Sequence, residues 1–271
     1  MSETSVDGVA VVVEGDGEVL RIVLDRPERK NALGPPAVAR VIDALERAAT
    51  DATLRVIVLD SSSADFCTGA DWVATNSGPD DVKPRTGSIQ RRTPLQAHRL
   101  IELITEVQLP VVCVVRGWAA GLGCQLALAA DFTIATESSH FWEPFLERGF
   151  TPDSGATWLV PRLVGLARAK DLLLLGREVQ GWEAAEWGLI HRAVPDADLD
   201  GEADALVRRL RRAPTVAYGL TKRCIHRALD SSLSAAMEAE AHALELSSRS
   251  PDFREGLAAF REKRTPRFDG R

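Results

Sequence analysis

The sequence predicts an α/β protein, with strands in its first half and helices almost throughout its second half. Three apolar runs in the first half are typical of buried strands, namely Val56–Leu59, Val111–Val115 and Phe132–Ala135. Helical patterns separate these runs, and strands separated by helices favour parallel pairing. After Ser154 the pattern is almost wholly helical. The 271 residues suit one large domain, or one domain with a small appendage.

The chain begins with a predicted β-hairpin. Val9–Val13 and Val19–Leu24 have the apolar character of strands, and the pair Asp16-Gly17 between them is a turn signal. A helix is predicted over residues 36–49, where apolar side chains recur with a helical period. Residues 76–94 are polar and contain glycine and proline, which indicates a mobile loop beside the site.

The remaining elements are helices. One is predicted over residues 95–106 and an apolar one over residues 125–130. Further helices are predicted over residues 156–164, 167–175, 182–187, 199–211, 216–229, 233–247 and 253–263. The strand–helix alternation of the first half would also fit a spiral of repeated ββα turns, although the units have little sequence similarity to one another.

Composition excludes several classes of function. The net charge is −6 and the pI about 5.5 without a dominant basic patch, so we expect no nucleic-acid partner. No apolar run is long enough to span a membrane, and the acidic start does not resemble a signal peptide. Four cysteines without metal-ligand spacing and five scattered histidines predict a cytosolic protein with reduced thiols and no metal site.

Two glycine-containing stretches follow predicted strands. The first contains Phe66-Cys67-Thr68-Gly69-Ala70-Asp71, and the second runs from Gly117 to Cys124 with glycine also at 121 and 123. Glycine lets a ligand approach the main chain, and the second stretch also opens a helix, whose first N–H groups are free. Two such loops on neighbouring strands can direct two N–H groups at one oxygen, which is an oxyanion hole. Close packing of helix on strand explains the same glycines equally well, and the dinucleotide, P-loop and nucleophile-elbow patterns are absent.

Several runs in register resemble the enoyl-CoA hydratase/isomerase (crotonase) superfamily over nearly the whole chain. They are IVLDRPERKNAL, VIVLDSSSADFCTGADW, VVRGWAAGLGCQLALAADF, GFTPDSGATWLVPRLVG, AAEWGLI and SPDFREGLAAFREKRTPRF. The resemblance implies a crotonase-like spiral of ββα units over residues 1–200 and a C-terminal helical trimerisation region over residues 201–271. It also implies an acyl-CoA substrate, a homotrimer or a dimer of trimers, and no permanently bound cofactor, because coenzyme A enters as part of the substrate.

The resemblance also assigns site residues. The oxyanion donors would be the N–H groups of Ala70 and Leu122, where the second is usually a glycine in the family, and the Leu122 side chain would narrow the acyl pocket beside Gly121. Coenzyme A would lie along the first glycine stretch. Two further residues would reach it from the C-terminal helix. The implied coenzyme contacts are Arg29, Lys30, Thr68, Ala70, Asp71, Trp72, Phe260 and Lys263.

The sequence departs from a hydratase at both catalytic positions. The family's hydratases have two carboxylates where this chain has Gln125 and Phe145. Gln125 can still hydrogen-bond a water, but Phe145 cannot act as acid or base. The loss of both carboxylates should greatly lower the rate of hydration. Asp153 matches the position of the working acid in some isomerase members, and the chain is most similar to the 1,2-epoxyphenylacetyl-CoA isomerase branch, which also has Phe at 145. Asp153 would alternatively cap the following helix.

Other polar and aromatic residues are weaker candidates. Glu143 and Glu147 flank Phe145, share a face whether the segment is extended or helical, and are more often solvated. Asp71 is expected to be structural or near coenzyme A. Cys67 and Cys124 lack an activating partner and are expected to be inert. Four aromatic residues suit either an aromatic-acyl pocket or the core, namely Trp118, Phe141, Trp142 and Phe145.

Three functional hypotheses follow. The favoured one is an isomerase that removes a proton beside the thioester carbonyl with Asp153 and returns it elsewhere. The second is a hydratase in which Glu143 or Glu147 replaces the missing pair. The third is an acyl-CoA-binding protein with little chemistry, because a fold does not fix a function.

Overall fold

The computed structural model describes residues 5–71 and 85–271, and its centre is a six-stranded sheet. The strand order is β1 (Val9–Glu14), β2 (Val19–Leu24), β3 (Val56–Ser61), β4 (Val111–Val115), β6 (Phe132–Thr136) and β9 (Arg192–Val194). β1 and β2 form the predicted antiparallel hairpin, and every neighbouring pair from β2 onward is parallel. The predicted α/β class and the parallel pairing are therefore confirmed.

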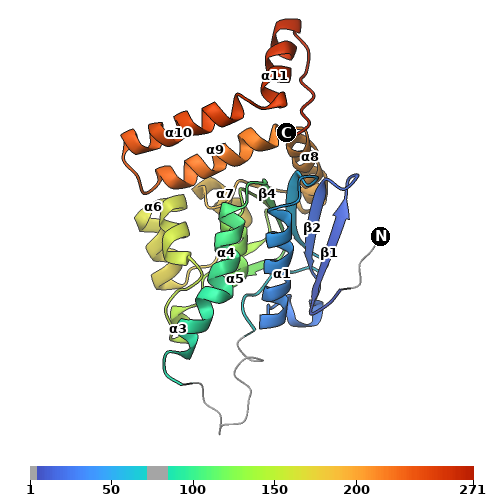
Figure 1. Ribbon diagram of the computed structural model, residues 1–271. Coiled ribbons are helices and arrows are strands. Elements are labelled where there is room, and N and C mark those ends of the chain that lie inside the picture. The colour runs from blue at the N-terminus through green and yellow to red at the C-terminus, as the bar shows by residue number, and fades with distance from the viewer. Residues whose placement is uncertain (1–4, 72–84) are drawn as a thin grey trace.

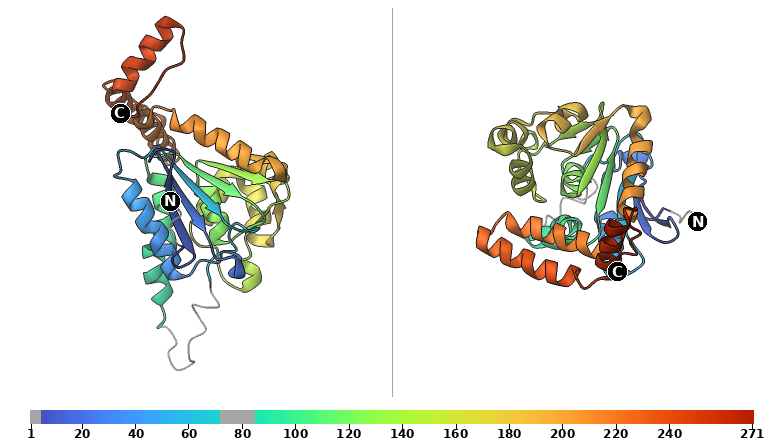
Figure 2. Two further views of the ribbon diagram at one scale, coloured as in Figure 1. Left: turned by 90° about the vertical axis from the view of Figure 1, so that its right-hand side faces the viewer. Right: turned by 90° about the horizontal axis from the view of Figure 1, so that it is seen from above.

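A smaller sheet lies next to the first. It contains β5 (Trp118–Ala120), β7 (His140–Trp142) and β8 (Val179–Gln180), in that order. β5 follows β4 directly and β7 follows β6, so two consecutive strand pairs each turn a corner from the large sheet into the small one (Figure 2). At the first corner Gly117 has a φ of 57°, and a Cβ there would lie 2.2 Å from the carbonyl oxygen of Ala64, so only glycine fits. None of these short strands was predicted, because two or three residues carry no measurable period.

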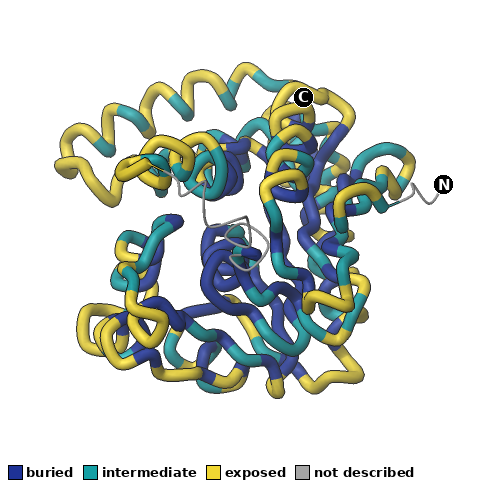
Figure 3. Tube along the Cα trace, turned by 90° about the horizontal axis from the view of Figure 1, so that it is seen from below, coloured by how far each residue is buried: buried dark blue, intermediate teal, exposed yellow. Residues whose placement is uncertain are grey.

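Helices cover both faces of the large sheet. The strands alternate their side chains, so that Ile57 and Leu59 pack with α1 (Pro35–Ala48), α4 (Ala97–Glu106) and α5 (Leu122–Ala129) in one apolar cluster. Val56 and Val58 point the other way and pack with α8 (Leu199–Arg211) in a second cluster. Every residue of α5 is buried, which explains its continuous apolar sequence. Figure 3 shows the buried residues gathered in the interior of the molecule and the exposed ones around its periphery.

The last part of the chain is helical, as predicted. It contains α6 (Ala156–Leu175), α7 (Gly181–Trp187), α9 (Thr215–Ala228), α10 (Leu233–Ser247) and α11 (Pro251–Glu262). The two helices predicted over residues 156–175 are one element with a break at Gly165, whose φ of 76° and ψ of 168° are not helical. α9 and α10 lie side by side across one end of the molecule, and α11 projects beyond them (Figure 1).

Apolar side chains remain exposed on these C-terminal elements. They include Leu166, Leu175, Ile225, Leu233, Met237, Leu244, Leu246 and Phe260. Contiguous exposed apolar patches are typical of interaction surfaces, whereas single exposed apolar residues are ordinary.

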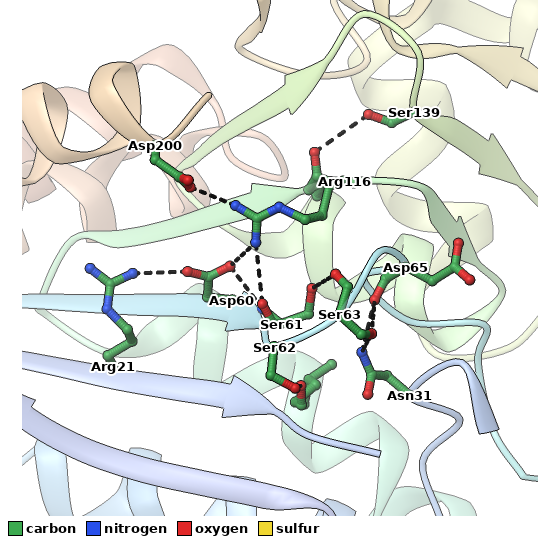
Figure 4. A network of polar contacts seen from close by, with 12 residues as sticks. Arg21, Asn31, Asp60, Ser61, Ser62, Ser63, Asp65, Arg116, Ser139 and Asp200 are labelled. Atoms are coloured by element: carbon green, nitrogen blue, oxygen red, sulfur yellow. Dashed lines mark hydrogen bonds and ion pairs between the residues drawn. The ribbon is translucent and has the colours of Figure 1, made fainter. Parts of the chain in front are cut away.

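A polar network holds the ends of β3 and β4 together, just before the two glycine stretches (Figure 4). Asp60 accepts hydrogen bonds from Arg21 at 3.0 Å and from Arg116 at 3.2 Å. Burial raises the pKa of Asp60, and the two guanidinium groups oppose that shift. Beside this network, Asn31 donates to the carbonyl oxygen of Asp65 at 2.8 Å, which holds the turn containing Lys30 against the first glycine stretch.

One predicted loop is only partly visible in the described residues. Residues 76–84 of the loop predicted over 76–94 lie outside them, whereas α3 (Ser88–Arg92) and the 3₁₀ turn η2 (Thr93–Leu95) occupy the rest. The predicted helix over 95–106 accordingly begins at Ala97. Within the described ranges, no helix is long and apolar enough to cross a membrane.

Candidate active site

The two glycine stretches are in direct contact. The N–H of Cys67 donates to the carbonyl oxygen of Trp118, and the N–H of Ala120 donates to that of Cys67, each at 2.9 Å. Gly69 has a φ of 99°, and a Cβ added there would lie 2.9 Å from the carbonyl oxygen of Ala120 and 3.5 Å from the nitrogen of Leu122. The two backbones therefore approach each other more closely than side chains would allow.

The N–H groups of Ala70 and Leu122 have no backbone acceptor among the residues that the structure describes. Leu33 donates to Gly69 at 2.8 Å and accepts from Asp71 at 2.9 Å, so Ala70 between them turns its own N–H away from Leu33. Leu122 is the first residue of α5, and the first N–H groups of a helix have no acceptor within it. Ala70 and Leu122 line one cavity, and no backbone acceptor is found for either N–H within residues 5–71 and 85–271. This arrangement suits a bound carbonyl oxygen that gains negative charge.

Gly123→Ala is expected to destabilise the protein, because the added Cβ would lie 2.2 Å from the carbonyl oxygen of Cys67. Overpacking of this kind costs about 1–3 kcal/mol, and here the clash is with backbone. Denaturant unfolding measures the loss. Gly201→Ala is the matched control, because no atom lies within 4 Å of its Cβ and the change should leave stability equal or slightly higher. Equal stability of the two variants would contradict this account of the contact.

The cavity in front of these N–H groups encloses about 910 Å³, part of it open to solvent. Its walls come from the start of α1, from both glycine stretches, from α3 and η2, and from the segment before α6. The lining residues are Leu33, Pro35, Val38, Thr68, Gly69, Ala70, Ile89, Arg92, Thr93, Gln96, Ala97, Gly121, Leu122, Pro144, Phe145, Arg148, Phe150, Asp153 and Ser154.

Asp153 is the one carboxylate among these lining residues. Burial raises the pKa of its carboxyl group, while the hydroxyl of Ser154, which donates to it at 3.0 Å, and the nearby His98 lower that pKa. The capping alternative is wrong for its side chain: α6 begins at Ala156, and no side chain caps its N-terminus. The Asp153 backbone carbonyl accepts from Ala156 at 3.0 Å, which leaves the carboxylate to face the cavity.

The segment carrying Glu143, Phe145 and Glu147 is neither extended nor α-helical. Glu143 follows β7, and Phe145 precedes the 3₁₀ turn η3 (Leu146–Arg148). The three side chains therefore do not share one face. Glu143 is 1% exposed and lies behind the cavity, which corrects the expectation of a solvated carboxylate. Glu147 is exposed, and Phe145 lines the cavity, where its ring meets that of Phe150 edge to face at 5.6 Å.

Gln125 also lies behind the cavity. It is completely buried, and its Nε2 donates to Oε1 of Glu143. Burial raises the pKa of Glu143 to about 8, against weaker opposing effects of Cys124 and Gln125. Gln125 was a candidate for substrate binding that could still hydrogen-bond a water, but it does not line the cavity and its amide donates to a neighbouring carboxyl group.

The other aromatic candidates lie away from the cavity. Trp118 stacks on His140 with ring centroids 4.5 Å apart and meets Trp142 edge to face, and neither tryptophan is among the lining residues. Phe141 is fully buried in the main apolar cluster.

The thiols near the site are buried and inert. Burial raises the pKa of Cys67 to about 12 and that of Cys124 well above its usual value. A thiol with a raised pKa is rarely present as the reactive thiolate. Within the described ranges, no group of three or more His, Cys, Asp or Glu side chains is arranged to hold a metal ion.

Only some of the residues expected to contact coenzyme A line the cavity. Thr68 and Ala70 line it, and Thr68 is joined to Lys30, whose carbonyl oxygen accepts from the Thr68 N–H at 3.1 Å. Asp71 is buried and forms ion pairs with Arg26 at 2.9 Å and with Arg29 at 3.1 Å, so its role is at least partly structural. Trp72 lies outside the described residues.

Phe260 and Lys263 lie far from the cavity of their own chain. Phe260 is on α11 and Lys263 follows it, and α11 projects from the end of the molecule opposite α3 (Figure 1). Any contact of these two residues with coenzyme A would therefore be made on a second copy of the chain.

Several lining residues escaped the sequence analysis. Arg92 on α3 and Arg148 in η3 line the cavity, and the guanidinium carbon of Arg148 lies 5.8 Å from the ring centre of Trp142. Ile89, Gln96 and Phe150 complete the wall. No motif marks these residues, because they come from short turns brought together only by the fold.

A family comparison agrees with this geometry. Residues 14–271 match the family model described as enoyl-CoA hydratase/isomerase. The chain belongs to the enoyl-CoA hydratase/isomerase family. The predicted crotonase-like fold is confirmed by solved structures: an enoyl-CoA hydratase from Bacillus anthracis superposes with a TM-score of 0.89 at 29% identity, over 97% of this chain and 100% of that one.

Relatives within the enoyl-CoA hydratase/isomerase family have different activities in their names. The chain is 37% identical to a 1,2-epoxyphenylacetyl-CoA isomerase of Escherichia coli K12, over 93% of this chain and 95% of the relative. It is 40% identical to a probable enoyl-CoA hydratase of Rhodobacter capsulatus, over 92% of this chain and 94% of the relative. It is 30% identical to a 4-chlorobenzoyl coenzyme A dehalogenase of Arthrobacter, over 93% and 91%. The chain is thus a crotonase-family enzyme of acyl-CoA thioesters, and the reaction has to be argued from the site.

Proposed function

We propose that this protein is an isomerase of an enoyl-CoA or a ring-bearing acyl-CoA, in which Asp153 moves the proton. The observation that carries the proposal is that Asp153 is the one carboxylate among the cavity-lining residues, in the same cavity as the N–H groups of Ala70 and Leu122. Hydration by the family's route needs two working carboxylates, whereas isomerisation needs one group that takes a proton and returns it.

The proposed reaction balances with these residues alone. The Asp153 carboxylate takes a proton from the carbon beside the thioester carbonyl, and the electron pair of that C–H bond forms an enolate. The two N–H groups stabilise the negative oxygen. In a 3-enoyl thioester, the same carboxyl group then gives the proton to the far end of the double bond, and the product is the conjugated 2-enoyl isomer.

The surroundings of Asp153 suit this role. Its pKa is raised by burial, and a base with a pKa nearer to neutrality takes and returns a proton more readily than an ordinary aspartate. The apolar residues Leu33, Leu122 and Phe145 line the cavity and suit an acyl group, and we propose that the Leu122 side chain narrows this part of the cavity.

We propose further that the enzyme works as a homotrimer or a dimer of trimers. The exposed apolar side chains of α6, α9, α10 and α11 support an assembly through the C-terminal helices. Phe260 and Lys263 would then contact coenzyme A on a neighbouring subunit, beside Arg29, Lys30 and Thr68 of that subunit.

An activity comparison tests the proposed function. Purified protein is offered crotonyl-CoA, for hydration, and a 3-enoyl-CoA, for conversion to the 2-enoyl isomer, while the absorbance of the conjugated thioester is followed. We expect isomerisation without appreciable hydration. Hydration at an ordinary rate would contradict the single-carboxylate reaction, and acyl-CoA binding without either reaction would favour the binding-protein alternative.

A further inference from the structure

A buried acid–amide pair lies next to the second glycine stretch. Gln125 and Glu143 are at most 1% exposed, and Nε2 of Gln125 donates to Oε1 of Glu143. Neither residue lines the cavity, and no Arg, Lys or His within the described ranges forms an ion pair with Glu143. A buried carboxylate without a cation is costly, so the protonation of this group needs an explanation.

The two remaining oxygens of the pair have no partner. Oε1 of Gln125 and Oε2 of Glu143 are both buried and make no hydrogen bond. Both atoms can only accept when Glu143 is ionised, so neither can then donate to the other, and the Cys124 thiol is the further donor near Glu143. One proton on Oε2 of Glu143 supplies a donor within the pair, and a carboxylic acid and an amide can join through two hydrogen bonds in a ring. Burial, which raises the pKa of Glu143 to about 8, favours the same protonated form at neutral pH.

The pair connects the elements that aim the Leu122 N–H. Gln125 is one turn after Leu122 on α5, and its N–H donates to the carbonyl oxygen of Gly121 at 3.0 Å. Glu143 directly follows Trp142, whose carbonyl oxygen accepts from the Gly121 N–H at 2.9 Å. The acid–amide contact therefore bridges α5 and the end of β7 at the place where the second glycine stretch turns.

We propose that Glu143 is a positioning residue that works as a neutral acid, locking Gln125 and so holding the Leu122 N–H toward the thioester oxygen. The proposal rests on the proposed function, because it assumes that Leu122 serves an oxyanion hole. Loss of the Glu143 proton would leave both oxygens able only to accept and would weaken the lock.

The charges around Glu143 fix the direction of the pH effect. The titratable groups that face it are the Cys124 thiol on α5 and Asp153 before α6, and the Asp153 charge raises the pKa of Glu143. An ionised Glu143 would add negative charge beside Asp153 and near the developing enolate. We therefore expect carbonyl polarisation, and with it the rate, to fall as pH rises through about 8.

The stability of the folded protein is also expected to fall as pH rises, for a separate reason. The pKa of Glu143 in the folded protein, about 8, is above the ordinary value of 4.5, so the folded state holds a proton that the unfolded chain has lost between these values. Stability from this group is complete at low pH and declines as pH rises through that window. Glu143→Gln should remove this part of the slope.

The experiment uses wild type, Glu143→Gln and the control Glu147→Gln, whose carboxylate is exposed on the same segment. Infrared spectra of wild type and of each variant are subtracted from one another, and a protonated carboxyl group appears in the difference through its C=O stretch. We expect that band in wild type and in Glu147→Gln at pH 7, its loss in wild type above pH 8, and its absence from Glu143→Gln. Absence of the band from wild type at neutral pH would overturn the proposal, even if the variant failed to fold.

A second readout separates the positioning role from the proposed reaction. An aromatic 2-enoyl-CoA absorbs at longer wavelength when a bound carbonyl is polarised, whether or not turnover follows. We expect the shift in wild type to weaken above pH 8 and the shift in Glu143→Gln to stay constant with pH. A shift that responds to pH equally in both proteins would overturn the positioning role. A normal shift without isomerisation would instead refute the proposed function alone.

Discussion

Asp153→Asn is expected to lower the rate of isomerisation by about 10²–10⁴-fold while acyl-CoA binding is retained. The amide has nearly the shape of the carboxyl group and can still accept from Ser154, but it cannot take a proton. Turnover of a 3-enoyl-CoA measures the first effect, and the dissociation constant of the acyl-CoA measures the second. Unchanged turnover would exclude Asp153 as the base.

Glu147→Gln is the matched control for this variant. Glu147 is exposed, does not line the cavity and lies six positions before Asp153, yet it is a carboxylate that the hydration alternative would use. We expect its loss to change isomerisation little. A large loss in Glu147→Gln together with a small one in Asp153→Asn would reverse the assignment.

The pH dependence of wild type adds a directional check on Asp153. The group must be ionised to accept a proton, and burial raises its pKa. The rate should therefore fall on acidification at a higher pH than an ordinary aspartate would give, and Asp153→Asn should lack this limb.

Leu122→Pro is expected to lower kcat by about 10²–10³-fold, which is the usual effect of removing one oxyanion donor. Leu122 is the first residue of α5, a position where proline is tolerated because its missing N–H would have no helical acceptor. The change therefore removes the proposed donor with little cost to the helix. The rate of isomerisation and the free energy of unfolding should both be measured.

Leu122→Ala is the control that keeps the N–H and removes the side chain. Because the Leu122 side chain lines the cavity, we expect this variant to alter the affinity for the acyl group more than the rate of proton transfer. If the proline and alanine variants had equal rates, the Leu122 N–H would not stabilise the enolate.

The fold could be predicted largely from apolar patterns and from a family resemblance. β2, β4, α8 and α10 begin and end where they were predicted, because their apolar runs are bounded by polar or turn residues. The strands of the small sheet could not be predicted, since two or three residues have no period and their pairing is set by Gly117 and the corner it permits. The Gly165 break in α6 was predicted as a gap between two helices.

The candidate site was predictable where backbone carries the chemistry and less so where side chains do. Gly69 and Gly121 marked the two loops, and the structure brings these loops together. Glu143 was expected in solvent because glutamate usually is, but its neighbours Gln125 and Cys124 bury it. Trp118 suited either an aromatic-acyl pocket or the core, and β5 turns its ring toward His140, outside the lining residues of the cavity.

The most direct test of the central claim follows the proton itself. A 3-enoyl-CoA is turned over in D₂O by wild type, Asp153→Asn and Leu122→Pro, and NMR follows the loss of the proton beside the carbonyl, the appearance of the 2-enoyl isomer and any entry of deuterium. The account predicts loss of a proton from the carbon beside the carbonyl and formation of the 2-enoyl isomer in wild type, with both steps greatly slowed in each variant. A hydrated product, or proton loss that proceeds at the wild-type rate in Asp153→Asn, would contradict it.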